Sequence, residues 1–153
     1  MGPLARGRRR VVHQLPSTLP PDVLHVGWTP LARLLPRTAG LVHHGGIGTL
    51  AHAIRAGVPQ LIVPFAHDQP DNANRVRALG IAERLDRRRF TAERAARALD
   101  GLLGDVQVRA RCAVYAARVD FARAAEEACD VIEAAAHGGS DPAPPGPAPP
   151  RMP

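Results

Sequence analysis

Short runs of hydrophobic residues recur along the first half of the chain, each bounded by proline or glycine. Runs this short and apolar are typical of strands in a parallel sheet. They alternate with segments that have helical spacing of hydrophobic residues, which predicts an α/β fold. We therefore expect a Rossmann-like domain of three layers, with helices on both faces of a parallel sheet. The expected strands are residues 23–28, 39–43, 61–63 and 81–85, with helices at 48–56 and 72–79 between them.

Smaller signals flank these elements. Residues 11–13 suggest a short strand, and a helical turn at 31–35 should stop at Pro36. Thr91 is a suitable helix cap, although Arg94 stands where a capping box has Glu or Gln. Alanine-rich helices are expected from there to about 103 and then from 106 to 136. The sequence thus predicts an N-terminal tail or remnant of a preceding unit at 1–21, a folded domain at 22–136, and a disordered tail rich in Pro, Ala and Gly at 137–153.

Composition narrows the class of protein. The chain has 153 residues, of which 45% are hydrophobic, enough for one domain with a core. Its net charge is +6, but the basic residues are all Arg and are scattered apart from one cluster at residues 6–10. Only 3% of residues are aromatic and no recognition motif accompanies the charge, so we expect no nucleic-acid partner. No run approaches the roughly 18 apolar residues of a membrane span, and no apolar segment follows the N-terminal arginines. A cytoplasmic protein without a transmembrane segment is expected.

A glycine-rich turn joins an expected strand to an expected helix at His43-His44-Gly45-Gly46-Ile47-Gly48-Thr49. Glycines allow a tight turn and close approach of a ligand to the backbone. The helix N-terminus adds free N–H groups and a partial positive charge, which suit a phosphate. Thr49 and His44 add a hydroxyl and an imidazole donor. The alternative is a plain strand-to-helix turn in which the glycines serve geometry alone.

A second interpretation fits the same residues. The segment from Gly46 to Ala51 matches the dinucleotide-binding pattern G-x-G-x-x-A, and Asp68 follows about twenty residues later, after a strand. Asp68 lies inside a loop bounded by prolines, however, and does not close its strand directly. An NAD-type dinucleotide-binding domain therefore stays open as an alternative.

A polar loop follows the next expected strand, from Pro64 to Pro70. Asp68 and Gln69 can accept and donate hydrogen bonds to the hydroxyls of a sugar. The alternative is an ordinary loop in which Asp71 or Asn72 caps the next helix. Because both loops follow parallel strands, they should lie on the same rim of the sheet.

Two stretches carry a resemblance to a known family: GWTP at residues 27–30 and LVHHGGIGTLAHAIRAGVPQLIVPFAHDQPDNANRV at 41–76. They resemble the donor-binding signature of the UDP-glycosyltransferase superfamily with the GT-B fold, notably bacterial sterol and macrolide glycosyltransferases. The resemblance implies the C-terminal half of such an enzyme. It also implies inverting transfer of a hexosyl group from a nucleotide-diphosphate sugar, with a UDP-sugar as the expected donor, to an acceptor hydroxyl.

The resemblance also implies roles for individual residues. Trp28 would stack on the base and the Thr29 backbone would bond its edge. The diphosphate would lie against His44, helped by Gly46, Gly48 and the Thr49 hydroxyl, while Asp68 and Gln69 would hold the sugar. His52 stands where plant members carry a Glu that contacts the ribose. These expected donor-binding residues are Trp28, Thr29, His44, Gly46, Gly48, Thr49, His52, Asp68 and Gln69.

The family has a further N-terminal domain that binds the acceptor and carries the catalytic base, usually a His. Residues 1–22 supply neither, so we expect no catalytic residue in this chain and a missing acceptor-binding domain as its partner. A non-catalytic nucleotide-sugar-binding remnant of a truncated or split enzyme is the alternative. No cofactor beyond the donor is expected, and no metal site, since the histidines show no His-x-x-x-His spacing.

Overall fold

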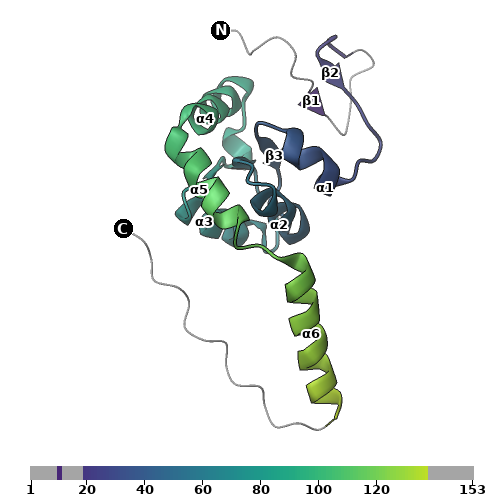
Figure 1. Ribbon diagram of the computed structural model, residues 1–153. Helices are drawn as coiled ribbons and strands as arrows, with labels where there is room; N and C mark the ends of the chain where they lie inside the picture. The colour runs from purple at the N-terminus through teal and green to yellow at the C-terminus, as the bar shows by residue number, and fades with distance from the viewer. Residues whose placement is uncertain (1–9, 12–18, 138–153) are drawn as a thin grey trace.

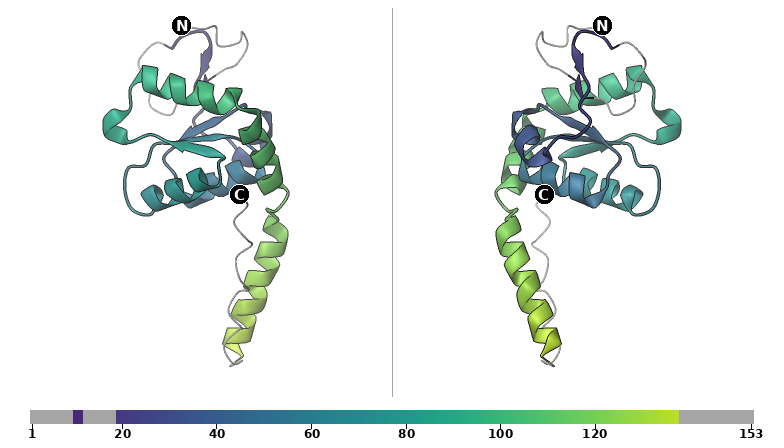
Figure 2. Two further views of the ribbon diagram at one scale, coloured as in Figure 1. Left: turned by 90° about the vertical axis from the view of Figure 1, so that its left-hand side faces the viewer. Right: turned by 90° about the vertical axis from the view of Figure 1, so that its right-hand side faces the viewer.

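The computed structural model describes residues 10–11 and 19–137, and its main body has three layers. The middle layer is a parallel sheet of β3 (Leu41–His43), β4 (Gln60–Ile62) and β5 (Ala82–Arg84), in the order β3-β4-β5. Val42 is in register with Leu61, and Leu61 with Glu83. Helix α4 (Ala92–Gly104) covers one face, and α2 (Ile47–Arg55) and α3 (Gln69–Ala78) cover the other (Figure 2). The prediction of a three-layer α/β domain with a parallel sheet is confirmed.

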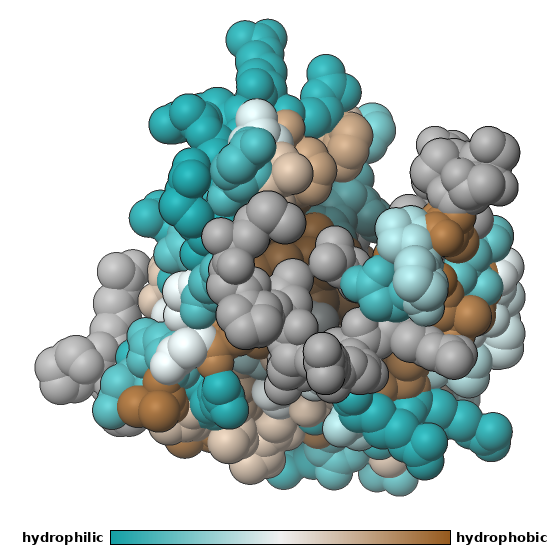
Figure 3. Space-filling model, turned by 90° about the horizontal axis from the view of Figure 1, so that it is seen from above, coloured by the Kyte–Doolittle hydropathy of each residue, from teal (hydrophilic) through white to brown (hydrophobic). Residues whose placement is uncertain are grey.

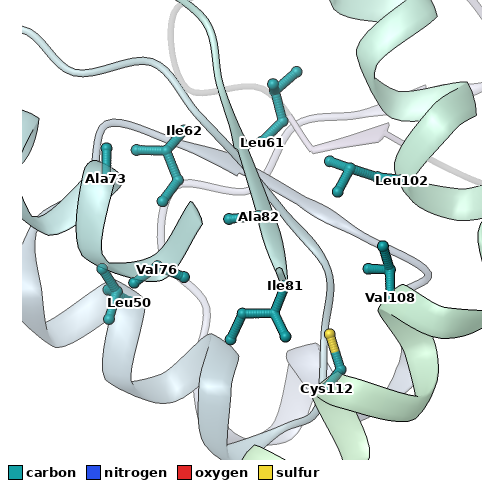
Figure 4. Packing of buried hydrophobic residues seen from close by; sticks show 10 residues of the cluster. All are labelled: Leu50, Leu61, Ile62, Ala73, Val76, Ile81, Ala82, Leu102, Val108 and Cys112. Carbon is teal, nitrogen blue, oxygen red and sulfur yellow. The ribbon is translucent and has the colours of Figure 1, made fainter. Parts of the chain in front are cut away.

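The core lies between these layers. Leu61 and Ile62 of β4 are fully buried, and side chains from the helices on both faces converge on β4 and on β5 (Figure 4). Neighbouring residues of a strand point to opposite faces, so a strand covered on both sides is apolar throughout. The cluster consists of Leu50, Leu61, Ile62, Ala73, Val76, Ile81, Ala82, Leu102, Val108 and Cys112.

The expected strand at 23–28 is wrong in length. Only Val23–Leu24 (β2) is a strand, and it pairs in parallel with Arg10–Val11 (β1) in a separate two-stranded sheet. Leu24 is 40% exposed, so this strand lacks the cover that makes a central strand continuous. The boundary predicted between residues 21 and 22 falls between these two strands. The tail predicted at 137–153 lies outside the described residues except for His137, which follows α6.

Two prolines lie inside helices that were expected to avoid them. Pro36 is part of the 3₁₀ helix η1 (Leu35–Arg37), which continues α1 (Leu31–Leu34), and Pro70 lies in the first turn of α3 (Gln69–Ala78). Proline is tolerated in a first turn because its missing N–H would have no helical partner there. Helix α3 therefore begins three residues earlier than predicted, and Gln69 belongs to it.

The predicted helix at 106–136 is two helices. Helix α5 (Val106–Ala116) begins after Asp105, and α6 (Phe121–Ala136) begins after Asp120, whose carboxylate accepts hydrogen bonds from the N–H groups of Ala122 and Arg123. An Asp that caps a new helix competes with continuing the old one. Helix α6 extends away from the body (Figures 1 and 2), and none of its residues is buried.

The remaining elements agree closely with expectation. Gly57 and Gly80 follow α2 and α3 with φ of 66° and 70°, as glycines that end helices do. The Thr91 hydroxyl accepts a 3.3 Å hydrogen bond from the Arg94 N–H, so Thr91 caps α4 as predicted. In the described part of the chain, no helix combines the length and apolarity needed to cross a membrane. A short 3₁₀ helix, η2 (Arg87–Arg89), lies between β5 and α4.

Candidate functional site

The glycine turn leaves the start of α2 free to bind a ligand. Strand β3 ends at His43 and α2 begins at Ile47, with Gly46 as its N-cap. Gly46 offers no side-chain cap to the N–H groups of the first turn. Those N–H groups lack helical partners and carry the positive end of the helix dipole. An anion is the natural partner for such a helix start.

Each glycine of the turn has a different reason to be there. Gly45 has φ of 95°, and a Cβ on it would lie 2.9 Å from Cγ2 of Ile62 and 3.2 Å from the carbonyl oxygen of Gln69. Gly45 is therefore required by the close approach of the second loop. A Cβ on Gly48 would meet nothing within 4 Å, so space is open above the first turn of α2.

His44 lies over the same turn. Its Nε2 atom would be 2.7 Å from a Cβ built on Gly46, so the imidazole covers that glycine. The His44 side chain is exposed and Thr49, on the first turn of α2, is half-buried. The structure thus brings His44, Gly46, Gly48 and Thr49 together, as the resemblance implies.

The second loop is held by its own side chains. The Gln69 side-chain oxygen accepts hydrogen bonds from the backbone N–H groups of Phe65 (2.9 Å) and Ala66 (3.2 Å). Its side-chain NH₂ group makes no hydrogen bond with any described residue and is free to donate. His67 has φ of 59°, a left-handed conformation that costs about 1–3 kcal/mol and clusters at functional sites.

Asn72 connects the two loops. Its side-chain nitrogen donates to the Gly45 carbonyl at 3.1 Å and to Oδ2 of Asp68 at 2.7 Å. The expectation that both loops share one rim is therefore confirmed. The alternative in which Asp71 or Asn72 caps α3 is wrong: the N-cap is Asp68, and Asp71 forms a surface ion pair with Arg75. Nothing in the sequence had singled out Asn72 as this bridge.

A partly buried pair of side chains behind the turn was also missed. Nδ1 of His43 accepts a 3.1 Å hydrogen bond from the Gly45 N–H, so the neutral ring carries its proton on Nε2, which donates to Oε1 of Gln60 at 3.0 Å. Burial lowers the pKa of His43 to about 4; the bond to Gln60 opposes this shift, and the charge of His44 adds to it. Gln60 is fully buried and its NH₂ group has no partner among the described residues.

Three other expected residues are less closely joined to the turn. Trp28 is 82% exposed and precedes α1, whose Leu31 packs on a buried cluster that includes Ala53 of α2. No hydrogen bond or ring contact among the described residues joins Trp28 or Thr29 to the glycine turn. The His52 ring lies edge-on to Phe121, with ring centres 5.5 Å apart, so His52 supports the start of α6.

The segments of this site carry exposed hydrophobic side chains, as α5 and α6 also do. Trp28, Ile47 and Phe65 are 82%, 63% and 59% exposed, and they come from the three segments to which donor-binding roles were assigned. Hydrophobic residues also show at several places on the surface seen in Figure 3, among predominantly hydrophilic ones. Large apolar side chains at the surface of a site are suited to stacking on a ligand or packing against a partner. Within the described ranges, no group of three or more His, Cys, Asp or Glu side chains converges as in a metal site.

The comparison with known families agrees with this geometry. Residues 9–134 match the family described as "Erythromycin biosynthesis protein CIII-like, C-terminal domain". The fold is that of the C-terminal domain of GT-B glycosyltransferases. The chain belongs to the erythromycin biosynthesis protein CIII-like C-terminal domain family.

Curated and solved relatives are of the same kind. The chain is 40% identical over 133 residues to O-mycaminosyltylonolide 6-deoxyallosyltransferase of Streptomyces fradiae, with 84% of this chain and 32% of the relative covered. The calicheamicin glycosyltransferase CalG4 has a TM-score of 0.68 at 30% identity, covering 78% of this chain and 32% of that one. For the glycosyltransferase VinC in complex with DTDP, the TM-score is 0.62 at 38% identity, with 65% and 25% covered. The chain thus spans about a third of the length of the curated relative.

Proposed function

We propose that this chain binds the nucleotide-diphosphate sugar of a glycosyltransferase. The observation that carries the proposal is the uncapped start of α2, opened by the glycine turn and tied to the second loop through Asn72. The bridge holds the start of α2, which would bind the phosphates, next to two polar side chains suited to hydroxyl groups. Phosphate and hydroxyl groups are adjacent in the same way in the sugar-diphosphate part of a donor.

The roles follow the geometry of the two loops. The first-turn N–H groups of α2, with the Thr49 hydroxyl and His44, would stabilise the negative charge that develops on the diphosphate as it leaves. Gln69 has its carbonyl occupied by the loop backbone, so it would recognise the sugar as a donor, through its NH₂ group. Asp68 would accept from sugar hydroxyls through the carboxylate oxygen that Asn72 leaves free.

The base and ribose would lie toward Trp28, Thr29 and His52. A Trp that is 82% exposed has a face available for stacking on a base. His52 would reach a ribose only from the side of α2 on which its ring meets Phe121. The donor is the only small molecule that this proposal requires. The proposal includes a UDP-sugar as that donor and a cytoplasmic location, as expected from the sequence.

The complete reaction would be transfer of a hexosyl group to an acceptor hydroxyl with inversion. An acceptor-binding domain that supplies the general base would complete the site, since relatives such as the S. fradiae enzyme are about three times as long as the region matched here. A thymidine nucleotide is the second candidate for the donor, because VinC was solved in complex with DTDP. A binding module without activity and an NAD site remain the other outcomes of the test.

The test is a titration of the purified chain with UDP, TDP, a UDP-sugar and NAD, followed by calorimetry and by the fluorescence of Trp28, which is the one tryptophan of the chain. We expect a nucleoside diphosphate to bind and quench Trp28. His44→Ala and Thr49→Ala should each weaken binding about tenfold, as the loss of a hydrogen bond to a charged group does.

A matched control is Thr38→Ala, which removes a hydroxyl that bonds the Leu35 carbonyl away from the glycine turn. It should leave the affinity unchanged. Binding of NAD alone would support a dinucleotide domain. If the folded chain binds no nucleotide at all, the donor-site proposal is wrong.

A further inference from the structure

An arginine-lined cleft opens at the outer edge of the sheet. Strand β5 is the last strand in the order β3-β4-β5, and beyond it a cleft of about 660 Å³ lies between α3 on one side and α4 on the other. Five guanidinium groups and a single carboxylate line it. These charged residues are Arg77, Arg84, Arg89, Arg94, Arg97 and Asp86.

The positive charge of the cleft is only partly compensated. Arg77 lies 3.7 Å from Glu83, and Arg84 donates to the side-chain oxygen of Asn74 at 2.7 Å. The Asp86 carboxylate accepts from the N–H of Arg88 as the cap of η2. Arg89 and Arg94 have no side-chain hydrogen bond or ion pair with any residue that the structure describes.

The cleft is separate from the glycine turn. Helix α3 presents Asn72 to Gly45, whereas Asn74 and Arg77 line the cleft. Successive residues of a helix are about 100° apart, so Asn72 and Asn74 point to nearly opposite sides. None of the residues expected to bind the donor lines the cleft.

We propose that this cleft is a second anion site, for a small ligand that carries two or more phosphate groups. Planar guanidinium groups bind phosphate oxygens in pairs, and convergence from three chain segments suits a ligand with several such oxygens. The volume is that of a small-molecule site, while the charged lining excludes an apolar ligand. Arg84 and Arg94 are half-buried, which limits screening of their charge.

The probe for this site is inorganic pyrophosphate, titrated into the ¹⁵N-labelled chain at constant ionic strength and followed by amide chemical shifts. We expect saturable changes in the amide chemical shifts of residues 84–97. A separate set of amide shifts should change in the glycine turn. In the double variant Arg89→Gln/Arg94→Gln, the affinity for pyrophosphate obtained from the shifts of residues 84–97 should fall by at least about tenfold. The affinity obtained from the shifts of the glycine turn should stay unchanged.

The matched control is Arg88→Gln/Arg118→Gln, which removes the same charge from two exposed arginines outside the cleft. It should keep both sets of shifts. His44→Ala should reduce only the set in the glycine turn, so failure of the donor-site proposal and failure of the cleft proposal give different spectra. The cleft proposal is overturned if residues 84–97 do not shift, if they respond equally to sodium chloride at the same ionic strength, or if both double variants weaken binding alike.

Discussion

The side-chain amide of Asn72 donates a 3.1 Å hydrogen bond to the backbone carbonyl of Gly45, 27 residues earlier in the chain. The same nitrogen donates to Asp68 at 2.7 Å, so one side chain fixes the glycine turn, proposed to bind the diphosphate, relative to the loop that is proposed to bind the sugar. Helix α3 thereby holds the two loops of the proposed donor site next to each other.

Removing the Asn72 side chain should weaken the binding of a nucleotide sugar more than the binding of the nucleoside diphosphate alone. In Asn72→Ala we expect the affinity for a nucleotide sugar to fall about tenfold and that for the nucleoside diphosphate to fall much less, since the turn keeps its glycines. Calorimetry with the two ligands gives the ratio. Asp71→Ala, which removes an exposed carboxylate on the same helical turn that pairs with Arg75, should leave that ratio unchanged. Equal losses for both ligands in Asn72→Ala would argue against the bridge.

The glycines of the turn should respond differently to alanine. Gly45→Ala places a Cβ in a left-handed residue and 2.9 Å from Ile62, so the free energy of unfolding should fall by about 1–3 kcal/mol. Gly48→Ala should keep or raise stability, because Gly48 lies in α2 with open space around it, but should weaken binding of a diphosphate. Urea unfolding followed by circular dichroism and nucleotide titration separate the two effects. A stable Gly45→Ala variant would contradict the close packing of the loops.

Protonation of His43 should destabilise the fold in acid. Its pKa is lowered from 6.5 to about 4, mainly by burial, so between those values the unfolded chain binds more protons than the native one. The contribution of neutral His43 to the free energy of unfolding is fully present above pH 6.5. It is lost as the pH falls toward 4, by about 3 kcal/mol in total. The free energy of unfolding, measured at pH 7 and at pH 4.5, should therefore differ more in the wild type than in His43→Gln.

His25→Gln, which removes an exposed imidazole, is the control for that comparison. The prediction concerns the difference between the free energies of unfolding at the two pH values. An overall loss of stability in His43→Gln therefore does not affect it. If His43→Gln loses as much stability in acid as the wild type does, His43 is not the titrating group.

The sequence predicted the elements whose signals are local. The glycines that end α2 and α3, the Thr91 cap and the apolar run of β4 all act within a few residues, and each is present as expected. The break before α6 is also local: Asp120 is an N-cap signal within an alanine-rich segment, but helical periodicity outweighed it in the prediction.

The parts that the sequence did not predict depend on tertiary register. His43 meets Gln60 only because β3 and β4 are paired, and Asn72 meets Gly45 only because α3 returns beside the turn. Likewise, the hydrophobic pattern of Val23–Leu24 identifies a strand without saying which sheet it joins. Within the glycine turn, backbone geometry requires glycine at Gly45, whose φ is 95°.

The two cysteines should differ in reactivity. Cys112 is 2% exposed, and burial raises its pKa, whereas Cys129 lies exposed on α6. Since the thiolate is the reactive form, iodoacetamide should label Cys129 in the native chain and Cys112 only after unfolding. Peptide mass spectrometry after a timed reaction measures both. Rapid labelling of Cys112 in the native chain would show that α5 is not packed on the core.

The most direct measurement of the donor site is a crystal structure of the chain grown with UDP or TDP. The site described above predicts the diphosphate at the start of α2, within about 2.7–3.2 Å of the first-turn N–H groups and of His44 or Thr49. It also predicts the base against Trp28. A diphosphate bound only in the arginine-lined cleft, with the glycine turn empty, would contradict the assignment of this turn as the donor site.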